Sequence, residues 1–428
     1  MMHLRPAGLS VFTSLALALS SGAAAMGQLA NPGFEAAGSP PSVFDGWIDF
    51  GNSIPNIYRE AAFPLSGGFA CKMFGQFTGG VNASGVYQSF PTVKGQTWDG
   101  SAWAAHVTGD ALLGVNFGAI NIEFRGPGEE LLEYFTVSAI DALSPLDTYV
   151  QSTVQGVAPE DVASVRFVLL FVQPDFDAGA LFFDDASLTP IGTPLTTLLN
   201  PGFEDGTPEF SVRALRGWGE FGRNEFGNIR IDNLLPLTGQ TSVAMFGQFT
   251  GSENFTGVYQ SVPCAPGDQV TAEVWSAMPG IDPLVAGNEG FLNIEFRDAS
   301  NNLIPPVLTT PAIAEGGPTD TYIRSELVGV APAGAAKARL AIGLRQPALG
   351  GGNIFFDDAA ITVVSAPPQC AGDANGDNQV NGADLSVLLS QFGQSVTPGS
   401  GADFNNDGLV NGADLSVLLS NFGDDCSL

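Results

Sequence analysis

Hydrophobic and polar residues alternate over many short runs of this chain. In residues 121–125, for example, Ile122 and Phe124 alternate with polar neighbours, and residues 270–275 follow the same period. Glycine, proline, asparagine and aspartate separate the runs. A period of two points successive side chains to opposite faces of a strand. The pattern therefore predicts a mainly β fold, built of antiparallel sandwiches of jelly-roll type.

The sequence also repeats itself once, with a shift of about 170 residues. Five segments return in the same order: 31–35 at 200–204, 73–79 at 245–251, 85–89 at 257–261, 121–125 at 293–297 and 182–186 at 355–359. A repeat of this length has the size of a domain. We predict two tandem β-sandwiches, residues 27–190 and 196–365, followed by a small α-helical domain over residues 370–426. Phe34 and Trp47, and their counterparts Phe203 and Trp218, are assigned to the sandwich cores.

The first 25 residues have the order of a secretory signal peptide. A short basic start with His3 and Arg5 precedes an apolar run, and Ala23-Ala24-Ala25 offers a cleavage site. A buried N-terminal helix is the alternative. No other apolar run approaches the roughly 20 residues of a membrane span. We therefore expect a secreted protein, extracellular or at the cell surface, with no membrane span.

The net charge and the scarcity of histidine limit which partners and which catalytic chemistry this chain can have. Acidic residues number 44 and basic residues 15, for a net charge of −29. This charge repels the phosphates of nucleic acids, so we expect no nucleic-acid partner. His3 falls in the predicted signal peptide, which leaves His106 alone for imidazole chemistry. This scarcity disfavours serine triads and histidine-based zinc sites.

Two acidic segments near the C-terminus, residues 373–384 and 403–414, carry the clearest chemistry. Both place oxygen-bearing side chains at positions 1, 3, 5 and 12, the spacing with which an EF-hand-like loop wraps Ca²⁺. The predicted ligands are Asp373, Asn375, Asp377, Asp384 and the Gln379 carbonyl in the first loop, and Asp403, Asn405, Asp407, Asp414 and the Leu409 carbonyl in the second. Position 6 needs a sharp turn, which Gly408 suits better than Asn378. Asx-rich turns without a metal are the alternative.

A short amphipathic helix should follow each loop. Apolar residues recur at i, i+3, i+4 and i+7, namely Leu385, Leu388, Leu389 and Phe392, and Leu415, Leu418, Leu419 and Phe422. We expect the two stripes to bury against each other. A unit so small needs further ties, which two Ca²⁺ ions and a Cys370–Cys426 disulfide would supply. The pairing of Cys71 and Cys264 is left open.

Residues 370–426 resemble type I dockerin domains, which contain two loop–helix repeats without the first helix of an EF-hand. The resemblance implies calcium binding and a cohesin-like partner protein. The helix-start positions that help such domains choose a partner hold Gly382-Ala383 and Gly412-Ala413 here, in place of the hydroxyl pair of the best-known members. A calcium module without a cohesin partner is the alternative.

Each sandwich repeat opens with Asn-Pro-Gly-Phe-Glu, continues with Gly-Trp and closes with Phe-Phe-Asp-Asp-Ala. This frame resembles the CenC-type carbohydrate-binding modules, jelly-roll domains of the galactose-binding-like class. The resemblance implies a polysaccharide or glycan partner. It also implies one structural Ca²⁺ per sandwich, held by Glu35 with Asp184 or Asp185, and by Glu204 with Asp357 or Asp358. Solvated acids that protect a sheet edge are the alternative.

A glycan face needs an aromatic platform and planar polar side chains, because sugars have apolar C–H faces and many hydroxyls. The alternation places such residues on the outer side of the predicted strands. The candidates are Trp103, Asn121, Glu123 and Arg125 in the first sandwich, and Trp275, Asn293, Glu295 and Arg297 in the second. We predict that the tryptophan and the Asn-Glu-Arg row form one face in each sandwich. A covered tryptophan and a solvated Glu–Arg pair are the alternative.

Three functions stay open from the sequence. The favoured interpretation is a secreted, non-catalytic glycan-binding protein with a calcium-dependent attachment module at its C-terminus. A jelly-roll glycoside hydrolase or polysaccharide lyase is the first alternative, with Glu123 and Glu295 as the obvious carboxylates. Each of these glutamates has an arginine two residues further on. A general acid needs a raised pKa, which a neighbouring positive charge opposes, so the arginine disfavours that role. A structural cell-surface spacer without a ligand is the second alternative.

Overall fold

The computed structural model describes residues 29–207, 211–365, 370–396, 399–405 and 407–425. The predicted signal peptide and Cys426 lie outside these residues, so the leader and the Cys370–Cys426 disulfide stay predictions. Cys71, which is buried, and Cys264 are free thiols. Within the described ranges, no helix is both long and apolar enough to pass through a bilayer.

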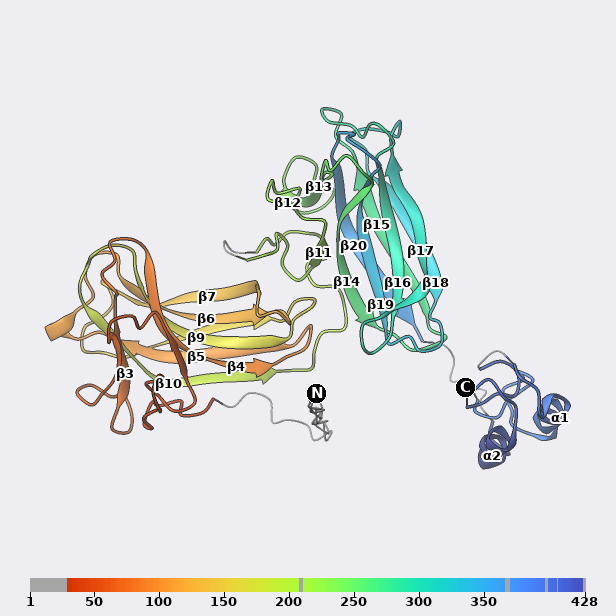
Figure 1. Cartoon of the computed structure of the whole chain (residues 1–428), viewed down its shortest axis with the longest axis horizontal. Coiled ribbons are helices and arrows are strands. Elements are labelled where there is room, and N and C mark those ends of the chain that lie inside the picture. The colour runs from red at the N-terminus through yellow and green to blue at the C-terminus, as the bar shows by residue number, and fades with distance from the viewer. Residues whose placement is uncertain (1–28, 208–210, 366–369, 397–398, 406, 426–428) are drawn as a thin grey trace, which may run out of the picture.

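Residues 48–191 fold into a first β-sandwich of two five-stranded sheets (Figure 1). One sheet has the order β1-β4-β9-β6-β7, made of β1 (Ile48–Phe50), β4 (Asn82–Pro91), β9 (Ser164–Gln173), β6 (Phe117–Arg125) and β7 (Leu131–Asp141). The other has the order β2-β3-β10-β5-β8, made of β2 (Ile57–Glu60), β3 (Ala70–Phe74), β10 (Ala180–Ile191), β5 (Thr97–Ala105) and β8 (Val150–Val157). A single 3-10 turn, η1 (Thr108–Asp110), follows β5.

Residues 219–364 repeat this arrangement in a second sandwich. Its first sheet has the order β11-β14-β19-β16-β17, made of β11 (Gly219–Phe221), β14 (Asn254–Pro263), β19 (Lys337–Gln346), β16 (Glu289–Arg297) and β17 (Leu303–Ala314). Its other sheet has the order β12-β13-β20-β15-β18, made of β12 (Ile229–Asp232), β13 (Ser242–Met245), β20 (Ile354–Val364), β15 (Gln269–Ala277) and β18 (Ile323–Val330). In Figure 1 the strands of the two sandwiches run in different directions.

The strand connections are those of a jelly roll. Every ladder between the strands of the first sandwich is antiparallel. Only β2 with β3 and β6 with β7 are consecutive strands that pair in one sheet, and at every other connection the chain crosses from one sheet to the other. The second copy crosses at the same places. The predicted mainly β fold with two tandem jelly-roll sandwiches is confirmed.

A hydrophobic core fills the space between the two sheets of each sandwich. Phe34, Trp47, Phe203 and Trp218 are at most 2% exposed, which confirms their assignment to the core. The Trp47 ring lies 5.1 Å from that of Phe34, and its indole N–H donates to the Asn31 carbonyl at 3.0 Å. Trp218 makes the same bond in the second copy. The core therefore holds the opening turn of each repeat in place.

The C-terminal segment contains two short helices, α1 (Gly382–Gln391) and α2 (Gly412–Ser420). Asn381 caps the first helix, because its side chain accepts a bond from a backbone N–H while Asp384 bonds back to the cap. Asn411 and Asp414 form the same capping box on the second helix. The predicted helix after each loop is therefore present, and its start is set by the loop residues.

The apolar stripes of these helices are only half buried, which corrects the expectation that they cover each other. Leu388 and Leu418 are fully buried, but Leu389 and Leu419 are 60% and 57% exposed. Phe392 and Phe422 are exposed as well. The reason is that loop residues, Val380, Ala402 and Val410, complete the small core and occupy the space that the outer half of each stripe would otherwise fill.

Candidate functional site

Three carboxylates of the first acidic loop converge on one point. Asp373, Asp377 and Asp384 have ligand oxygens within 4.8 Å of one another, the one such group among the described residues. Asp373 accepts bonds from the backbone N–H groups of Gly376 and Asn378, both at 2.7 Å, which wraps the chain around it. Carboxylates this close repel each other unless a cation lies between them. Because the donors are hard oxygens, this set of residues fits Ca²⁺.

Asp384, at position 12, anchors the loop from inside. Its buried carboxylate accepts bonds from the backbone N–H groups of Ala374 at 2.9 Å, Asn375 at 3.2 Å and Asn381 at 2.8 Å. Burial acts to raise the pKa of Asp384, but these bonds outweigh it and hold the pKa below its usual range. The side chain therefore stays charged, as a calcium ligand must be.

The second loop repeats this geometry. Asp414 accepts bonds from the N–H groups of Phe404 at 2.9 Å, Asn405 at 3.2 Å and Asn411 at 2.8 Å. At position 6, Asn378 and Gly408 both take left-handed conformations, with φ values of 65° and 81°. The carbonyl positions are also alike, since Gln379 and Leu409 form isolated bridges to Asp425 and Ser395. The described residues of the two loops thus share these bonds and this turn, although three carboxylates converge within 4.8 Å only in the first loop among the described residues.

The acids implied to hold calcium in the sandwiches meet at one loop of each sandwich. In the first sandwich, Asp184 accepts a bond from the Leu65 N–H at 2.8 Å, and Asp185 accepts one from the Ser66 hydroxyl at 2.8 Å. Glu35 accepts a bond from the Gly68 N–H at 3.0 Å. Asp357, Asp358 and Glu204 make the matching bonds in the second. Among the described residues, these acids do not form a group with oxygens converging within 4.8 Å. One ion per sandwich therefore stays a prediction.

A groove of about 410 Å³ lies on the outer face of the sheet β11-β14-β19-β16-β17. Small residues, Gly257 on β14 and Ala341 and Gly343 on β19, form the middle of this face. A Cβ at Gly257 would lie 2.3 Å from the Phe221 ring, and one at Gly343 would lie 2.8 Å from the Phe291 ring. The Phe221 and Phe291 rings therefore lie directly on glycine backbone, where a larger residue would displace them, and they line the groove together with Ala341.

Aromatic rings line this groove in two pairs. Phe221 and Tyr259 stack with centroids 6.3 Å apart and planes 27° apart. Phe255 and Phe291 meet edge to face, with centroids 6.0 Å apart. Phe255 is 44% exposed, although a large aromatic side chain is usually buried. The groove thus offers apolar ring surface to a ligand.

Three of the predicted glycan-binding residues, Asn293, Glu295 and Arg297, line the same groove. Glu295 and Arg297 form an ion pair at 2.5 Å. The Oδ1 atom of Asn293 is buried and has no hydrogen-bond partner within the described structure. Buried polar atoms are normally paired, so this oxygen is an unsatisfied acceptor on a residue that lines the groove.

The corresponding row of the first sandwich has the same local chemistry. Glu123 pairs with Arg125, and the Oδ1 atom of Asn121 is likewise buried and unpaired among the described residues. Arg166 stacks over the Tyr87 ring at 4.0 Å, as Arg339 stacks over Tyr259 in the second copy. The polar part of the predicted face is therefore common to both copies.

The two tryptophans lie elsewhere, so the predicted single face is wrong in both copies. Trp275 is on β15 and Asn293 is on β16, and these strands belong to opposite sheets. Trp103 and Asn121 are separated in the same way, on β5 and β6. Because both side chains point away from the core, each tryptophan lies on the opposite outer face of its sandwich from the Asn-Glu-Arg row.

Comparison of the two copies identifies groove residues that the sequence analysis missed. Gly219 lies under the Tyr259 ring and Gly343 under the Phe291 ring. These glycines and Ala341 of the groove correspond to Ile48, Leu170 and Val168 of the first copy. The wall residues Phe255 and Phe291 correspond to Ala83 and Ala119. The hollow is thus shaped by residues specific to the second copy. A position-by-position comparison of the repeats at outward positions could have found them.

Comparison with known families adds to this geometry. Residues 371–422 match the model of the dockerin type I domain. This stretch contains both acidic loops and both helices. The C-terminal segment is a dockerin type I domain. No curated protein sequence gives a significant match to the chain.

Solved structures similar to the chain include carbohydrate-binding modules. The N-terminal CBM22-1–CBM22-2 tandem domain of Xyn10C from Paenibacillus barcinonensis is 17% identical with a TM-score of 0.29, over 81% of this chain and 100% of that one. TmCBM61 in complex with β-1,4-galactotriose is 17% identical with a TM-score of 0.27, over 39% of this chain and 97% of that one. The CBM22-1-GH10 modules of Clostridium thermocellum endo-1,4-β-D-xylanase 10B with xylohexaose are 15% identical, with a TM-score of 0.28, over 40% of this chain and 29% of that one. Similarities at this level do not assign a ligand.

The dockerin domain presents its exposed apolar residues in equivalent pairs. Leu389 and Phe392 belong to the first repeat, and Leu419 and Phe422 take the same places in the second. Four large apolar side chains about half exposed on a domain of this size are more than scattered surface leucines. The two repeats therefore offer two copies of one apolar surface.

Proposed function

We propose that this chain is a secreted, non-catalytic glycan-binding protein that binds polysaccharide in the groove of the second sandwich and attaches to a partner through its dockerin domain. The observation that carries the proposal is the unpaired, buried Oδ1 of Asn293 in the same groove as the exposed ring of Phe255. A sugar needs both kinds of group, because its C–H face packs on an aromatic ring while its hydroxyls need fixed polar partners.

The carboxylates of the groove support binding rather than cleavage. Glu295 is paired with Arg297. Burial raises the pKa of Glu220, but its oxygens accept bonds from the N–H groups of Ala214 and Leu215 at 2.5 and 3.1 Å and from Arg223 at 3.1 Å. Glycoside hydrolysis needs one carboxylic acid and one carboxylate that both reach the scissile bond. Both groove carboxylates are instead engaged with the protein itself.

Affinity electrophoresis of the full-length protein through gels that each contain one polysaccharide tests this proposal. We expect Phe255→Ala to weaken the retention on a bound polysaccharide at least about tenfold, roughly 1.4 kcal/mol, because it removes an aromatic contact at the groove wall. Phe226→Ala is the matched control, since Phe226 is 77% exposed in the same sandwich but does not line the groove.

The other outcomes of this screen point to different functions. If Trp275→Ala is retained like wild type, the groove is supported as the binding site. If Trp275→Ala loses retention and Phe255→Ala does not, the polysaccharide binds on the opposite sheet instead. If wild-type protein is retained by no polysaccharide, the structural spacer is favoured. Reducing sugar that is released by wild-type protein but not by Glu295→Gln would favour the enzyme.

We also propose that the dockerin domain binds a cohesin-type protein through its exposed apolar residues, with Leu389 and Leu419 at the centre of the two equivalent surfaces. The support is their exposure in a folded domain, which is typical of protein interaction sites. Because both repeats present the same residues, either repeat could dock in the same way. The domain would then bind its partner in two orientations.

A recombinant type I cohesin tests this surface in calorimetry with Ca²⁺ present. Leu389→Asp or Leu419→Asp alone should keep most of the affinity, because the other repeat still docks. The double variant should lose about a hundredfold or more, since an unpaired charge would be buried in the interface. Leu349→Asp, at a 63% exposed position of the second sandwich, is the control. Full affinity of the double variant would show that the partner docks elsewhere.

A further inference from the structure

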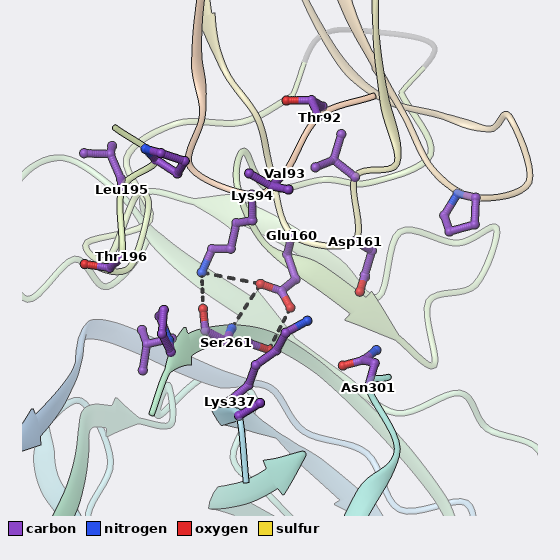
Figure 2. Close-up of a pocket in the computed structure, with 16 residues that line it drawn as sticks. Thr92, Val93, Lys94, Glu160, Asp161, Leu195, Thr196, Ser261, Asn301 and Lys337 are labelled. Carbon is purple, nitrogen blue, oxygen red and sulfur yellow. Dashed lines mark hydrogen bonds and ion pairs between the residues drawn. The ribbon is translucent and has the colours of Figure 1, made fainter. Parts of the chain in front are cut away.

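Lys94 and Glu160 reach from the first sandwich to the second (Figure 2). The Lys94 ammonium donates to the Ser261 carbonyl at 2.5 Å. Glu160 accepts bonds from the Ser261 N–H at 3.0 Å and the Ser261 hydroxyl at 2.8 Å, and both charged side chains are largely buried. Ser261 lies on β14, two residues from Tyr259 of the groove. Lys94 and Glu160 of the first sandwich therefore contact β14, a strand whose residues also line the groove.

Asp161, next to Glu160, contacts the groove residues directly. Its Oδ2 accepts bonds from the Tyr259 hydroxyl at 2.5 Å and from Arg213 at 2.9 Å. Arg339, which also lines the groove, stacks over the Tyr259 ring at 4.0 Å. The Arg339 guanidinium lies 3.6 Å from Glu160 and 3.9 Å from Asp161. Two side chains of the groove are thus held by carboxylates of the other sandwich.

Four of the charges that make this contact, Lys94, Glu160, Asp161 and Arg213, occur in only one of the two copies, whereas Arg339 has Arg166 as its counterpart. Glu160 and Asp161 correspond to Ala333 and Gly334 of the second copy, and Lys94 corresponds to Pro266. On the opposite side of the contact, Arg213 of the second sandwich corresponds to Ser42 of the first. Each sandwich thus carries these charged residues only at the end that contacts the other sandwich, and the equivalent positions at its far end are uncharged. A shared ancestral repeat does not account for this difference, whereas a specific contact does.

The backbone at Asp161 indicates that its side chain is needed. Asp161 has a φ of 58°, and its counterpart Gly334 has a φ of 83°. Glycine adopts this left-handed region freely, whereas a residue with a Cβ does so at some cost. An aspartate kept at a position that suits glycine places its carboxylate within reach of Tyr259.

We propose that Asp161 of the first sandwich is a positioning residue for the glycan groove of the second, because it holds the Tyr259 ring in place through the phenolic hydroxyl. The two sandwiches then form one binding unit. This inference rests on the proposed function of the groove. A ring that is already fixed against Phe221 loses less freedom when a ligand binds, so pre-organisation raises the affinity.

The test measures the affinity of the full-length protein for a polysaccharide that retains it. We expect Asp161→Gly, which restores the residue of the other copy without backbone strain, to weaken binding about tenfold. Asp161→Asn keeps an acceptor oxygen for Tyr259 and should stay within about threefold of wild type. Tyr259→Phe, which removes the hydroxyl alone, should match Asp161→Gly, and combining the two should add no further loss.

The matched control is Glu129→Gly. Glu129 also has a left-handed φ, 63°, and pairs at 2.8 Å with Arg166, the counterpart of Arg339, but this pair lies within the first sandwich. This variant should bind like wild type.

Each contrary result has a separate meaning. Unchanged affinity in Asp161→Gly and Tyr259→Phe, while Phe255→Ala still weakens binding, overturns the positioning role and leaves the proposed function intact. Equal losses in Asp161→Gly and Asp161→Asn would assign the effect to the ion pair with Arg213, which also overturns the role of the Tyr259 bond. Failure of wild-type protein and every variant to bind any polysaccharide would overturn the proposed function, and this inference with it.

Discussion

Removal of calcium from the full-length protein will unfold the dockerin domain and leave both sandwiches folded. The core of this domain is small, and three carboxylates of its first loop lie within 4.8 Å of one another. Without a cation these charges repel each other, so the free energy of calcium binding supplies the folding free energy of the domain. Far-UV circular dichroism should show loss of the helical signal in EDTA and its return with Ca²⁺, while the thermal transition of the sandwiches persists.

A single substitution should have the same effect on one loop. Asp384→Asn removes a charge and an acceptor oxygen from a buried side chain that holds three backbone N–H groups. We expect the calcium affinity of the first loop to fall at least about tenfold, roughly 1.4 kcal/mol. Asp424→Asn, at an exposed acid after α2, is the matched control.

Calorimetry should count two ions in the dockerin domain. It should count four in the full chain if each sandwich also holds the ion that the family resemblance implies. The loop assignment would be refuted by a helical signal that stays unchanged in EDTA after reduction of the predicted disulfide.

The second large effect is a gain of stability in Glu133→Gln above pH 7. Glu133, on β7, is 1% exposed, and the Arg216 guanidinium at 3.5 Å and the Gly217 N–H offset its burial only in part. Burial raises the pKa of Glu133 to about 7, although Arg216 and Arg213 of the second sandwich act to lower it; Asp205 adds to the rise. Arg216 lies 3.5 Å from Glu133 and stacks over the Phe135 ring, so Glu133 lies at the contact between the sandwiches.

The direction of the effect follows from proton linkage. The pKa of Glu133 is higher in the folded protein, about 7, than its ordinary value of 4.5, so the folded state binds the proton more tightly. The stabilisation is complete below pH 4.5 and is lost as the pH rises through about 7. The whole change amounts to roughly 3 kcal/mol. Glutamine resembles the protonated form and avoids this loss.

Urea unfolding of wild-type protein and Glu133→Gln on both sides of this pH window measures the effect. The two proteins should have similar free energies of unfolding below pH 4.5, and the variant should be more stable by up to roughly 3 kcal/mol above pH 7. Glu130→Gln, at the exposed neighbouring acid, is the matched control and should follow wild type throughout. Free energies for wild type and Glu133→Gln that stay parallel across the window would contradict the prediction.

The calcium loops could be predicted because all their ligands lie within twelve consecutive residues. Asp373 and Asp384 meet through local turns, in which the left-handed residue at position 6 reverses the chain. The helices that follow were predictable for the same reason. Their burial was only half predictable, because the period shows that Leu388 and Leu389 lie near the same side of a helix but not which of them the loop residues cover.

The groove was predictable only in part. The alternation correctly placed Asn293, Glu295 and Arg297 on the outer side of a strand, and the structure brings them to one hollow. It could not show that Trp275, on the preceding strand, belongs to the opposite sheet. A period of two reports which side of a strand a residue takes, but consecutive strands of a jelly roll either pair or cross to the other sheet.

By itself, the sequence determined the two β-sandwiches, their duplication and the acidic loops, because alternation, repeated segments and ligand spacing are properties of neighbouring residues. Only the tertiary structure decided that glycines on β14 and β19 lie beneath the Phe221 and Phe291 rings of the groove, and that Asp161 reaches Tyr259 from another sandwich. These features join residues far apart in the chain. Their positions depend on which strands and loops become neighbours in space, and no local pattern encodes that.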